Sequence, residues 1–281
     1  MRIDNKKHYI CSSIIKKLKS VKIKEVVNAL EKFAPLPLQE DYDNAGLQVG
    51  LTETEVTGAL LCLDITEIII DEAIERGCNL VVSHHPLIFR ALKRVSDGNE
   101  VQRCVMKAIK NDIAIISMHT NIDNAVGGVN YKMAEKMSLA HVQLLAPKIV
   151  DGMECGSGVV GCLPEPMDAK AFVGMLKETF GVECVQANAL LQRPISKVAV
   201  CGGAGAFLLG DAVAAGTDAF VTGEMHYHEF FDHDQQIQIC VIGHYQSEQF
   251  TNEIFKSIIE EKCKGVRCCL TRTCTNPIIY L

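Results

Sequence analysis

Residues 59–86, ALLCLDITEIIIDEAIERGCNLVVSHHP, decide the fold, because they read as a strand, a helix and a second strand in one short run. The first apolar run has strand length, and the next segment repeats its apolar residues at helical spacing. That helix ends at Gly77, where a C-cap favours left-handed backbone geometry. The second strand runs directly into His84, His85 and Pro86. This order of elements predicts an α/β fold.

Residues 197–228, KVAVCGGAGAFLLGDAVAAGTDAFVTGEMHYH, repeat the same order in the C-terminal part of the chain. A strand leads through a glycine-rich turn into a helix that ends at Gly216, and another apolar strand follows. Setting Gly77 against Gly216 also aligns Ser83 with Thr222. The recurrence predicts two related α/β halves.

Two further buried strands end in a common pattern of polar residues. The strand IAIIS precedes His119 and Asp123, and the strand IQICVIG precedes His244 and Glu248, so each is followed by H-x-x-x-D/E. Open α/β sheets place functional groups beyond the carboxyl ends of their strands, which is also where the histidine pair at 84–85 falls. If the two halves face each other, these clusters meet at the interface between them.

We predict that these clusters form a dinuclear divalent-metal site in that interface. Imidazole suits zinc, iron or manganese, and carboxylates widen the choice toward harder ions. A carboxylate can bridge two cations ~3.5–4 Å apart, the spacing that supports hydrolytic chemistry. A single histidine would more often have a structural role, but five such side chains fit two cations better than one. The predicted ligands are His84, His85, Asp123, His244 and Glu248.

Three other polar side chains have open roles. His119 could ligate a metal, contact a substrate, or donate to Asp123 and orient it. Glu224 and His228 follow the strand that ends at Thr222, and both are candidates for proton transfer near the metals.

The glycine-rich turn at 202–205 and the segment around Asp43 and Asn44 each allow two interpretations. The amides of the turn could hold phosphate at a helix N-terminus, or the glycines could only permit tight packing. As a dinucleotide-binding fingerprint the turn fails, because Leu208 occupies the third glycine position. Asp43 and Asn44 could fix a loop near the site or contact a substrate.

Composition excludes several classes of protein. The chain has 281 residues, 48% of them apolar and 22% charged, as in an ordinary globular protein. Its net charge of −6 argues against nucleic-acid binding. The 13 cysteines are odd in number, form no CxxC motif and mostly occupy apolar runs, which favours the reducing cytoplasm. No secretory signal is present, and no apolar run approaches the ~18 residues that span a bilayer, so we expect a soluble protein.

The sequence patterns predict that the chain has four parts. Residues 1–20 form a polar appendage, and residues 21–135 form the first half. Residues 136–195 are expected to bridge the halves and to complete the first, whereas residues 196–281 form the second.

Six motifs together resemble the NGG-interacting factor 3-like family, the GTP cyclohydrolase 1 type 2 homologues, from about residue 21 to the C-terminus: DYDNAGLQVG, SHHPLIF, MHTNIDNAVGGVN, VAVCGGAG, GEMHYHEFFD and IGHYQSEQF. The chain resembles the short form of the family, without the domain that longer members insert between the halves. Tyr42 departs from the pattern, since the family commonly has tryptophan there. The resemblance implies two α/β halves with a dinuclear site between them, and a toroidal homohexamer.

The resemblance also implies how the ligands divide between two cations. His85 and Asp123 would hold one cation, His84 and His244 the other, and Glu248 would bridge them. The family name implies hydrolytic opening of the imidazole ring of GTP with release of formate, and so a small nucleotide-like substrate. Two alternatives use the same residues: a metal-binding or metal-delivery protein without turnover, and a dinuclear phosphoesterase.

Overall fold

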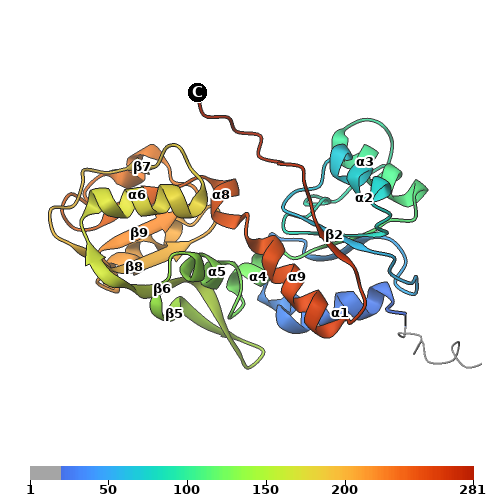
Figure 1. The fold of residues 1–281 in the computed structure, drawn as a ribbon, viewed down its shortest axis with the longest axis horizontal. Coiled ribbons are helices and arrows are strands. Elements are labelled where there is room, and N and C mark those ends of the chain that lie inside the picture. The colour runs from blue at the N-terminus through green and yellow to red at the C-terminus, as the bar shows by residue number, and fades with distance from the viewer. Residues whose placement is uncertain (1–19) are drawn as a thin grey trace, which may run out of the picture.

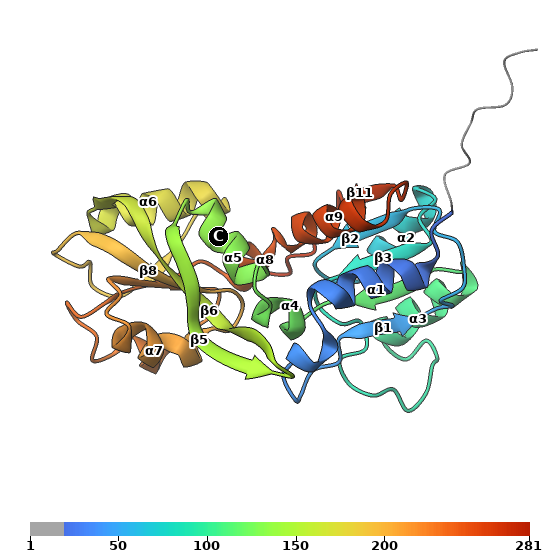
Figure 2. The same ribbon diagram turned by 90° about the horizontal axis from the view of Figure 1, so that it is seen from below.

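The computed structural model describes residues 20–281, which form two α/β halves side by side (Figure 1). The predicted appendage therefore lies outside the described residues, apart from Ser20. Figure 2 shows the halves from below, with short helical segments between them. The predicted α/β architecture of two halves is confirmed.

The first half is built on a five-stranded sheet with strand order β1–β4–β3–β2–β11. Its strands are β1 (Gly46–Val49), β2 (Ala59–Cys62), β3 (Leu80–Ser83), β4 (Ala114–Ser117) and β11 (Cys268–Leu270). All are parallel except β1, which pairs antiparallel with β4. Every residue of β2, β3 and β4 is buried, because helices cover both faces of the sheet.

Four helices cover this sheet. Helices α1 (Ile23–Phe33) and α9 (Thr251–Lys262) pack on one face, and α2 (Glu67–Glu75) and α3 (Glu100–Lys110) pack on the other. The residues that cap α2 agree with its observed bounds. The hydroxyl of Thr66 caps the first turn of α2, and Gly77 follows its end with a φ of 61°.

The second half is built on a six-stranded sheet with strand order β5–β6–β8–β9–β10–β7. Its strands are β5 (Ala140–Val150), β6 (Met153–Met167), β7 (Gln186–Ala187), β8 (Ile195–Cys201), β9 (Ala219–Thr222) and β10 (Gln238–Val241). Strands β8, β9 and β10 are parallel, and the hairpin β5–β6 joins β8 antiparallel. Helices α5 (Val129–Lys136) and α6 (Ala169–Phe180) cover one face, and η2 (Ala206–Leu208) and α7 (Leu209–Ala214) cover the other.

The internal repeat is visible in the two sheets. In the first half β2, α2, β3 and β4 occur in this order along the chain, with β3 between the other two strands in the sheet. In the second half β8, α7, β9 and β10 occur in the same order, with β9 between the other two strands. Two short helices stand at equivalent places, α4 (Thr120–Asn124) after β4 and α8 (His244–Glu248) after β10. The 3-10 helices η1 (Leu36–Leu38) and η3 (Tyr227–Phe230) lie in connections.

The structure divides the chain differently from the prediction in two places. Within residues 136–195, the long hairpin β5–β6 hydrogen-bonds to β8 and extends the second sheet, and only its tip, around Cys155, packs into the core of the first half. The end of the predicted second half, residues 196–281, returns to the first: α9 packs on α1, and β11 pairs with β2. Up to β11, the chain therefore crosses between the halves twice, through α4 and α5 and again through α8 (Figures 1 and 2).

The buried carboxylate of Glu72 on α2 holds the chain after β11. It accepts hydrogen bonds from the hydroxyls of Thr271 and Thr273 and from the amide of Arg272, and it pairs with Arg76 at 2.7 Å. Burial acts to raise the pKa of this carboxyl, but the donors lower it to about 2. From this anchor the C-terminal segment runs across toward the second half (Figure 1).

We expect this anchor to give the protein a specific acid sensitivity. Because the folded pKa of Glu72 lies below its ordinary value of 4.5, its stabilising contribution is present above pH 4.5 and is lost as the pH falls toward 2. Glu72→Gln should lower the free energy of unfolding at pH 7 by on the order of 2 kcal/mol and should flatten its dependence between pH 4.5 and 2. Urea unfolding at several pH values measures both, and an unchanged pH dependence would contradict the assignment.

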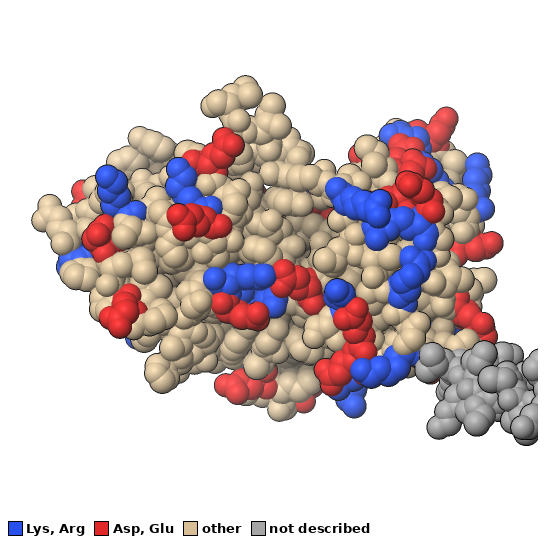
Figure 3. All heavy atoms as spheres, viewed as in Figure 1, with Lys and Arg blue, Asp and Glu red and all other residues tan. Residues whose placement is uncertain are grey.

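Charges of both signs are interspersed on the face drawn in Figure 3, so that face presents no extended field of one sign. None of the helices within residues 20–281 has the length and apolar character needed to cross a membrane.

Candidate metal centre

The two adjacent histidines reach the site because the sheet pairing continues past β3. The amides of His84 and His85 donate to the carbonyls of Cys62 and Leu63, at 3.3 and 2.9 Å. His84 is completely buried, and its Nδ1 lies 2.9 Å from the carbonyl oxygen of Met118. A carbonyl can only accept, so this nitrogen carries the proton and Nε2 keeps a free lone pair.

A carboxylate holds Nδ1 of each of the other three histidines at the site. Nδ1 of His85 lies 2.7 Å from Oδ1 of Asp64, and Nδ1 of His119 lies 2.7 Å from Oδ1 of Asp43. The third pair joins Nδ1 of His244 to Oε1 of Glu224 at 3.0 Å. An acceptor on Nδ1 fixes the ring and leaves Nε2 to bind a cation, the usual arrangement of metal-bound histidine.

The Nε2 atoms of three histidines converge on the carboxylate of Glu248. Those of His85 and His244 each lie 3.1 Å from Oε2, and that of His84 lies 3.6 Å from Oε1. Asp123 joins from α4, with its Oδ1 3.7 Å from Nε2 of His84. The structure thus brings all five predicted ligands together, from the chain just after β3 and from α4 and α8.

The donor atoms fit a bound cation. Within the described residues, the buried Nε2 of His84 and Oε2 of Glu248 make no hydrogen bond, although buried polar atoms are nearly always paired. Three groupings of donor atoms each fall within 4.8 Å: His84, His85 and His119; His85, His244 and Glu248; His84, Asp123 and Glu248. Nitrogen and carboxylate donors of this kind could hold a zinc, iron or manganese ion.

Burial and neighbouring charges together set the pKa values of the candidate ligands. Burial lowers the pKa of His84, which stays neutral. Burial acts in the same direction on His85 and His244, but their carboxylate partners raise the pKa of His85 to about 10 and that of His244 to about 9. Burial and the nearby Glu248 carboxylate raise the pKa of Asp123 well above its ordinary value. A cation must displace these protons, so metal affinity should rise with pH.

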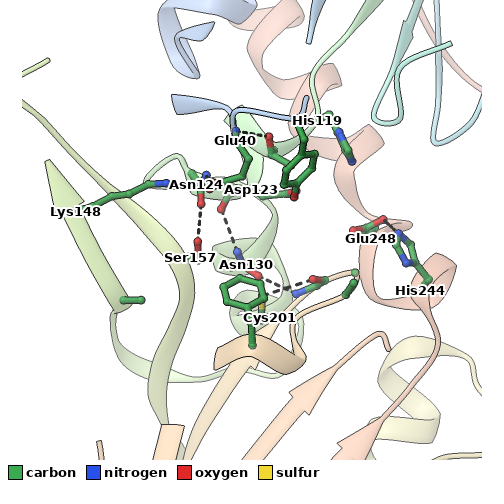
Figure 4. Close-up of a pocket in the computed structure, with 17 residues that line it drawn as sticks. Glu40, His119, Asp123, Asn124, Asn130, Lys148, Ser157, Cys201, His244 and Glu248 are labelled. Carbon is green, nitrogen blue, oxygen red and sulfur yellow. Dashed lines mark hydrogen bonds and ion pairs between the residues drawn. The ribbon is translucent and has the colours of Figure 1, made fainter. Parts of the chain in front are cut away.

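A cavity of about 520 Å³ opens beside these ligands between the halves. Figure 4 shows Asp123 and His119 reaching it from one side, and His244 and Glu248 from another. Three polar side chains line a further part of the wall around Asn124, whose amide donates to Glu40 and whose oxygen accepts from Ser157. Lys148 pairs with Glu40 there at 2.9 Å.

The glycine-rich turn serves packing rather than phosphate binding. The amides of Gly202, Gly203 and Gly205 donate to the side chains of Asn130, Ser247 and Thr222, at 2.9 to 3.1 Å. These donors are already used within the protein. Gly203 also passes so close to the carboxylate of Glu248 that a Cβ there would collide with it.

His119, Glu224 and His228, whose roles the sequence left open, occupy three different positions. The carboxylate partner of His119 is Asp43 rather than Asp123, and its ring lines the cavity, so it does not orient Asp123. Glu224 lies behind His244, where it positions the ring. The ring of His228 packs on Tyr227 in η3 and on Phe231 just after it, and within residues 20–281 no contact joins it to the ligands.

Sequence reasoning missed Asp64, which orients His85. A signal was available, because Asp64 ends the strand run ALLCLD at the same sheet edge as the other ligands. Its second oxygen accepts a hydrogen bond from the hydroxyl of Thr275 at 2.7 Å, so the C-terminal segment supports the site from outside.

We expect Asp64→Ala to lower metal affinity about 10–100-fold, the usual effect of removing an outer partner of a metal-bound histidine. Thr275→Val removes only the hydroxyl behind Asp64 and should have a smaller effect in the same direction. Competition with a chromophoric chelator measures both affinities. Wild-type affinity in Asp64→Ala would show that the carboxylate does not orient His85.

Fold and site together define a class: a protein of two repeated α/β halves with a histidine- and carboxylate-rich candidate metal centre between them. The chain belongs to the Duf34/NIF3 (NGG1p interacting factor 3) family, whose model matches residues 21–277. The predicted family is confirmed.

Curated relatives and solved structures agree with this membership. The chain is 35% identical over 229 residues to the GTP cyclohydrolase 1 type 2 homolog of Clostridium perfringens, covering 81% of this chain and 87% of the relative. It is 32% identical over 252 residues to NIF3-like protein 1 of Drosophila melanogaster, covering 85% and 84%. A crystal structure of a Bacillus cereus protein related to NIF3 superposes with a TM-score of 0.83 at 25% identity, covering 94% of this chain and all of that one.

Proposed function

We propose that the centre binds two divalent cations and that the protein is a metal-dependent hydrolase. One observation carries the proposal: three imidazole Nε2 atoms surround a buried carboxylate at the wall of an open cavity, and two of the donor atoms there have no hydrogen bond. A single cation would bind only one of the three groupings of donor atoms and would leave the donors of the other groupings without a cation. Two cations about 3.5–4 Å apart, bridged by Glu248, would use all five ligands.

Bound divalent cations supply Lewis acidity and lower the pKa of bound water toward neutrality. The chain's own residues prepare the site for this chemistry. Asp64 and Glu224 fix the rings of His85 and His244, and Glu248 is held ionised because the imidazoles around it keep its pKa well below the ordinary value, against the effect of burial. His119 faces the cavity beside the ligands and is the histidine best placed to contact a substrate or move a proton.

The substrate that the relatives suggest is GTP. The Clostridium perfringens relative is called a GTP cyclohydrolase 1 type 2 homolog, and we propose the corresponding reaction here, opening of the guanine imidazole ring with release of formate. The cavity of about 520 Å³ is within the usual range for a small-molecule site.

A metal-binding or metal-delivery protein without turnover is the second candidate, and a dinuclear phosphoesterase is the third. The enzyme is favoured because the cavity wall carries polar side chains, Asn124, Ser157 and Lys148, that no cation ligand requires. A delivery site would gain nothing from them.

One experiment separates these candidates. The purified protein is reconstituted with Mn, Fe or Zn and offered GTP and phosphoester substrates, with Glu248→Ala as the inactive comparison. Metal-dependent formate release that the variant lacks supports the cyclohydrolase, and release of phosphate or alcohol instead supports the phosphoesterase. Tight metal binding without turnover of any substrate contradicts both.

We also propose that the chain acts in the cytoplasm, as its cysteine usage favours, and that it assembles into a homohexamer, as the family resemblance implies. Light scattering of the purified protein tests the assembly, and a monomer at micromolar concentration would contradict it.

A further inference from the structure

The loop that follows the histidine pair is held firmly against the first half. This loop, residues 87–99, is the later part of the connection from β3 to α3. The backbone carbonyl of Ile88 accepts a hydrogen bond from the side-chain amide of Asn44 at 2.6 Å, and the backbone N–H of Ile88 donates to the side chain of Gln48 at 3.0 Å. The start of the loop therefore has a defined position beside the metal centre.

This loop surrounds a second cavity, of about 530 Å³, whose charged lining is entirely basic. Arg90, Lys93 and Arg94 line it, together with the amide side chains of Asn99 and Gln102, and no carboxylate among the described residues does. The central cavity differs, since its charged lining is mixed: three acidic residues, Glu40, Asp123 and Glu248, and Lys148, which pairs with Glu40.

The three cations of the loop are uncompensated. Within residues 20–281, no ion pair or side-chain hydrogen bond involves Arg90, Lys93 or Arg94, and all three are exposed. Lys107 and Arg103 on the neighbouring α3 do pair with carboxylates. Three unpaired cations around one cavity would attract an anionic ligand, although the chain as a whole has a net charge of −6.

One aromatic side chain joins this cavity to the metal centre. Phe89 lines the basic cavity, and its ring lies 6.5 Å from that of Tyr42 and 6.0 Å from that of His119, measured between centroids. Tyr42 and His119 in turn line the central cavity. A single ligand that passes over this aromatic contact would reach both cavities.

We propose that the basic cavity binds the phosphate groups of a small phosphorylated ligand whose reacting part lies at the metal centre. This proposal rests on the proposed function only in placing the reacting part of the ligand at the metal centre; binding of phosphate by the basic cavity does not depend on it. Arginine offers a planar fork of donors that matches phosphate oxygens, and lysine adds a compact charge. These donors would hold the phosphates away from the metal centre, so that the reacting part of the ligand could lie beside the cations.

The test measures binding of inorganic triphosphate to the metal-free, full-length protein by calorimetry, since bound cations would themselves attract phosphate. The combined variant Arg90→Gln, Lys93→Gln, Arg94→Gln should bind triphosphate at least about tenfold more weakly than wild type. A control with the same loss of charge, Lys170→Gln, Lys177→Gln, Lys264→Gln, alters exposed lysines away from the loop and should bind as wild type does. Circular dichroism and metal content confirm that both variants fold.

Comparing the affinities for GTP and for guanosine, which lacks the phosphates, extends the test to a complete ligand. Wild type should prefer GTP at least about tenfold, and the loop variant should lose that preference. No binding of triphosphate to wild type, equal binding by the loop variant, or an equal loss in the control would each overturn the proposal. Formate release is scored separately, so a protein that binds triphosphate through the loop but does not open GTP refutes the proposed function and leaves the subsite standing.

Discussion

Glu248→Ala should lower the affinity for divalent cations by more than about 100-fold. Removing a group that only orients a metal-bound histidine already lowers metal affinity about 10–100-fold, whereas Glu248 is itself a candidate ligand and contacts three of the ligand histidines. The variant should also lose the stabilisation that cations give. At a metal concentration about 100 times the dissociation constant, binding stabilises the folded state by about 2.7 kcal/mol. For a chain of this size that corresponds to a rise in Tm on the order of 5–10 °C.

Mass spectrometry of bound metal and thermal unfolding with and without Mn, Fe or Zn measure these effects. Glu248→Gln keeps the shape of the side chain and removes its charge, so it should fail in the same way. Glu253→Gln, on the neighbouring α9, removes a carboxylate that pairs with Lys136 at the surface and should keep wild-type metal content. Two cations retained in Glu248→Ala would exclude a bridging role for this residue.

Gly203→Ala is expected to disrupt the centre from the opposite side of Glu248. Gly203 has a φ of 61°, a conformation that costs an alanine about 1–2 kcal/mol. The added Cβ would also meet the Oε1 atom of Glu248 and the ring of His244, so the carboxylate must move away from the ligand histidines. We expect metal affinity to fall about 100-fold or more, with a loss of stability of about 1–3 kcal/mol.

Gly210→Ala provides the matched control. Gly210 lies in α7 with open space around its Cα and an ordinary backbone conformation, so alanine there should leave metal binding unchanged and stabilise the helix by up to about 1 kcal/mol. Equal metal affinities in Gly203→Ala and wild type would mean that the turn does not position Glu248.

The candidate ligands could be predicted from sequence because each depends on a local rule. A buried strand ends, the chain turns, and the polar residues that follow lie at the carboxyl edge of the sheet. His84, Asp123 and Glu248 all follow this rule, and the repeat explains why the clusters of the two halves meet. Helices such as α2 and α6 were also predictable, since their caps and apolar spacing are local features.

What could not be predicted depends on which distant segments meet. The hairpin β5–β6 has little alternation that would assign it to one sheet, and only its hydrogen bonds to β8 place it in the second half. Asp64 and Asp43 lie 21 and 76 residues from the histidines they hold. No short-range pattern links such pairs, so the partners of His85 and His119 became visible only in the folded chain.

The most direct test of the central claim is a crystal structure of the protein loaded with Mn or Zn, with the cations located by anomalous scattering. We predict two peaks about 3.5–4 Å apart, enclosed by His84, His85, Asp123 and His244, with Glu248 between them. A single peak would contradict the dinuclear centre, and no peak among these five side chains would contradict the metal site itself.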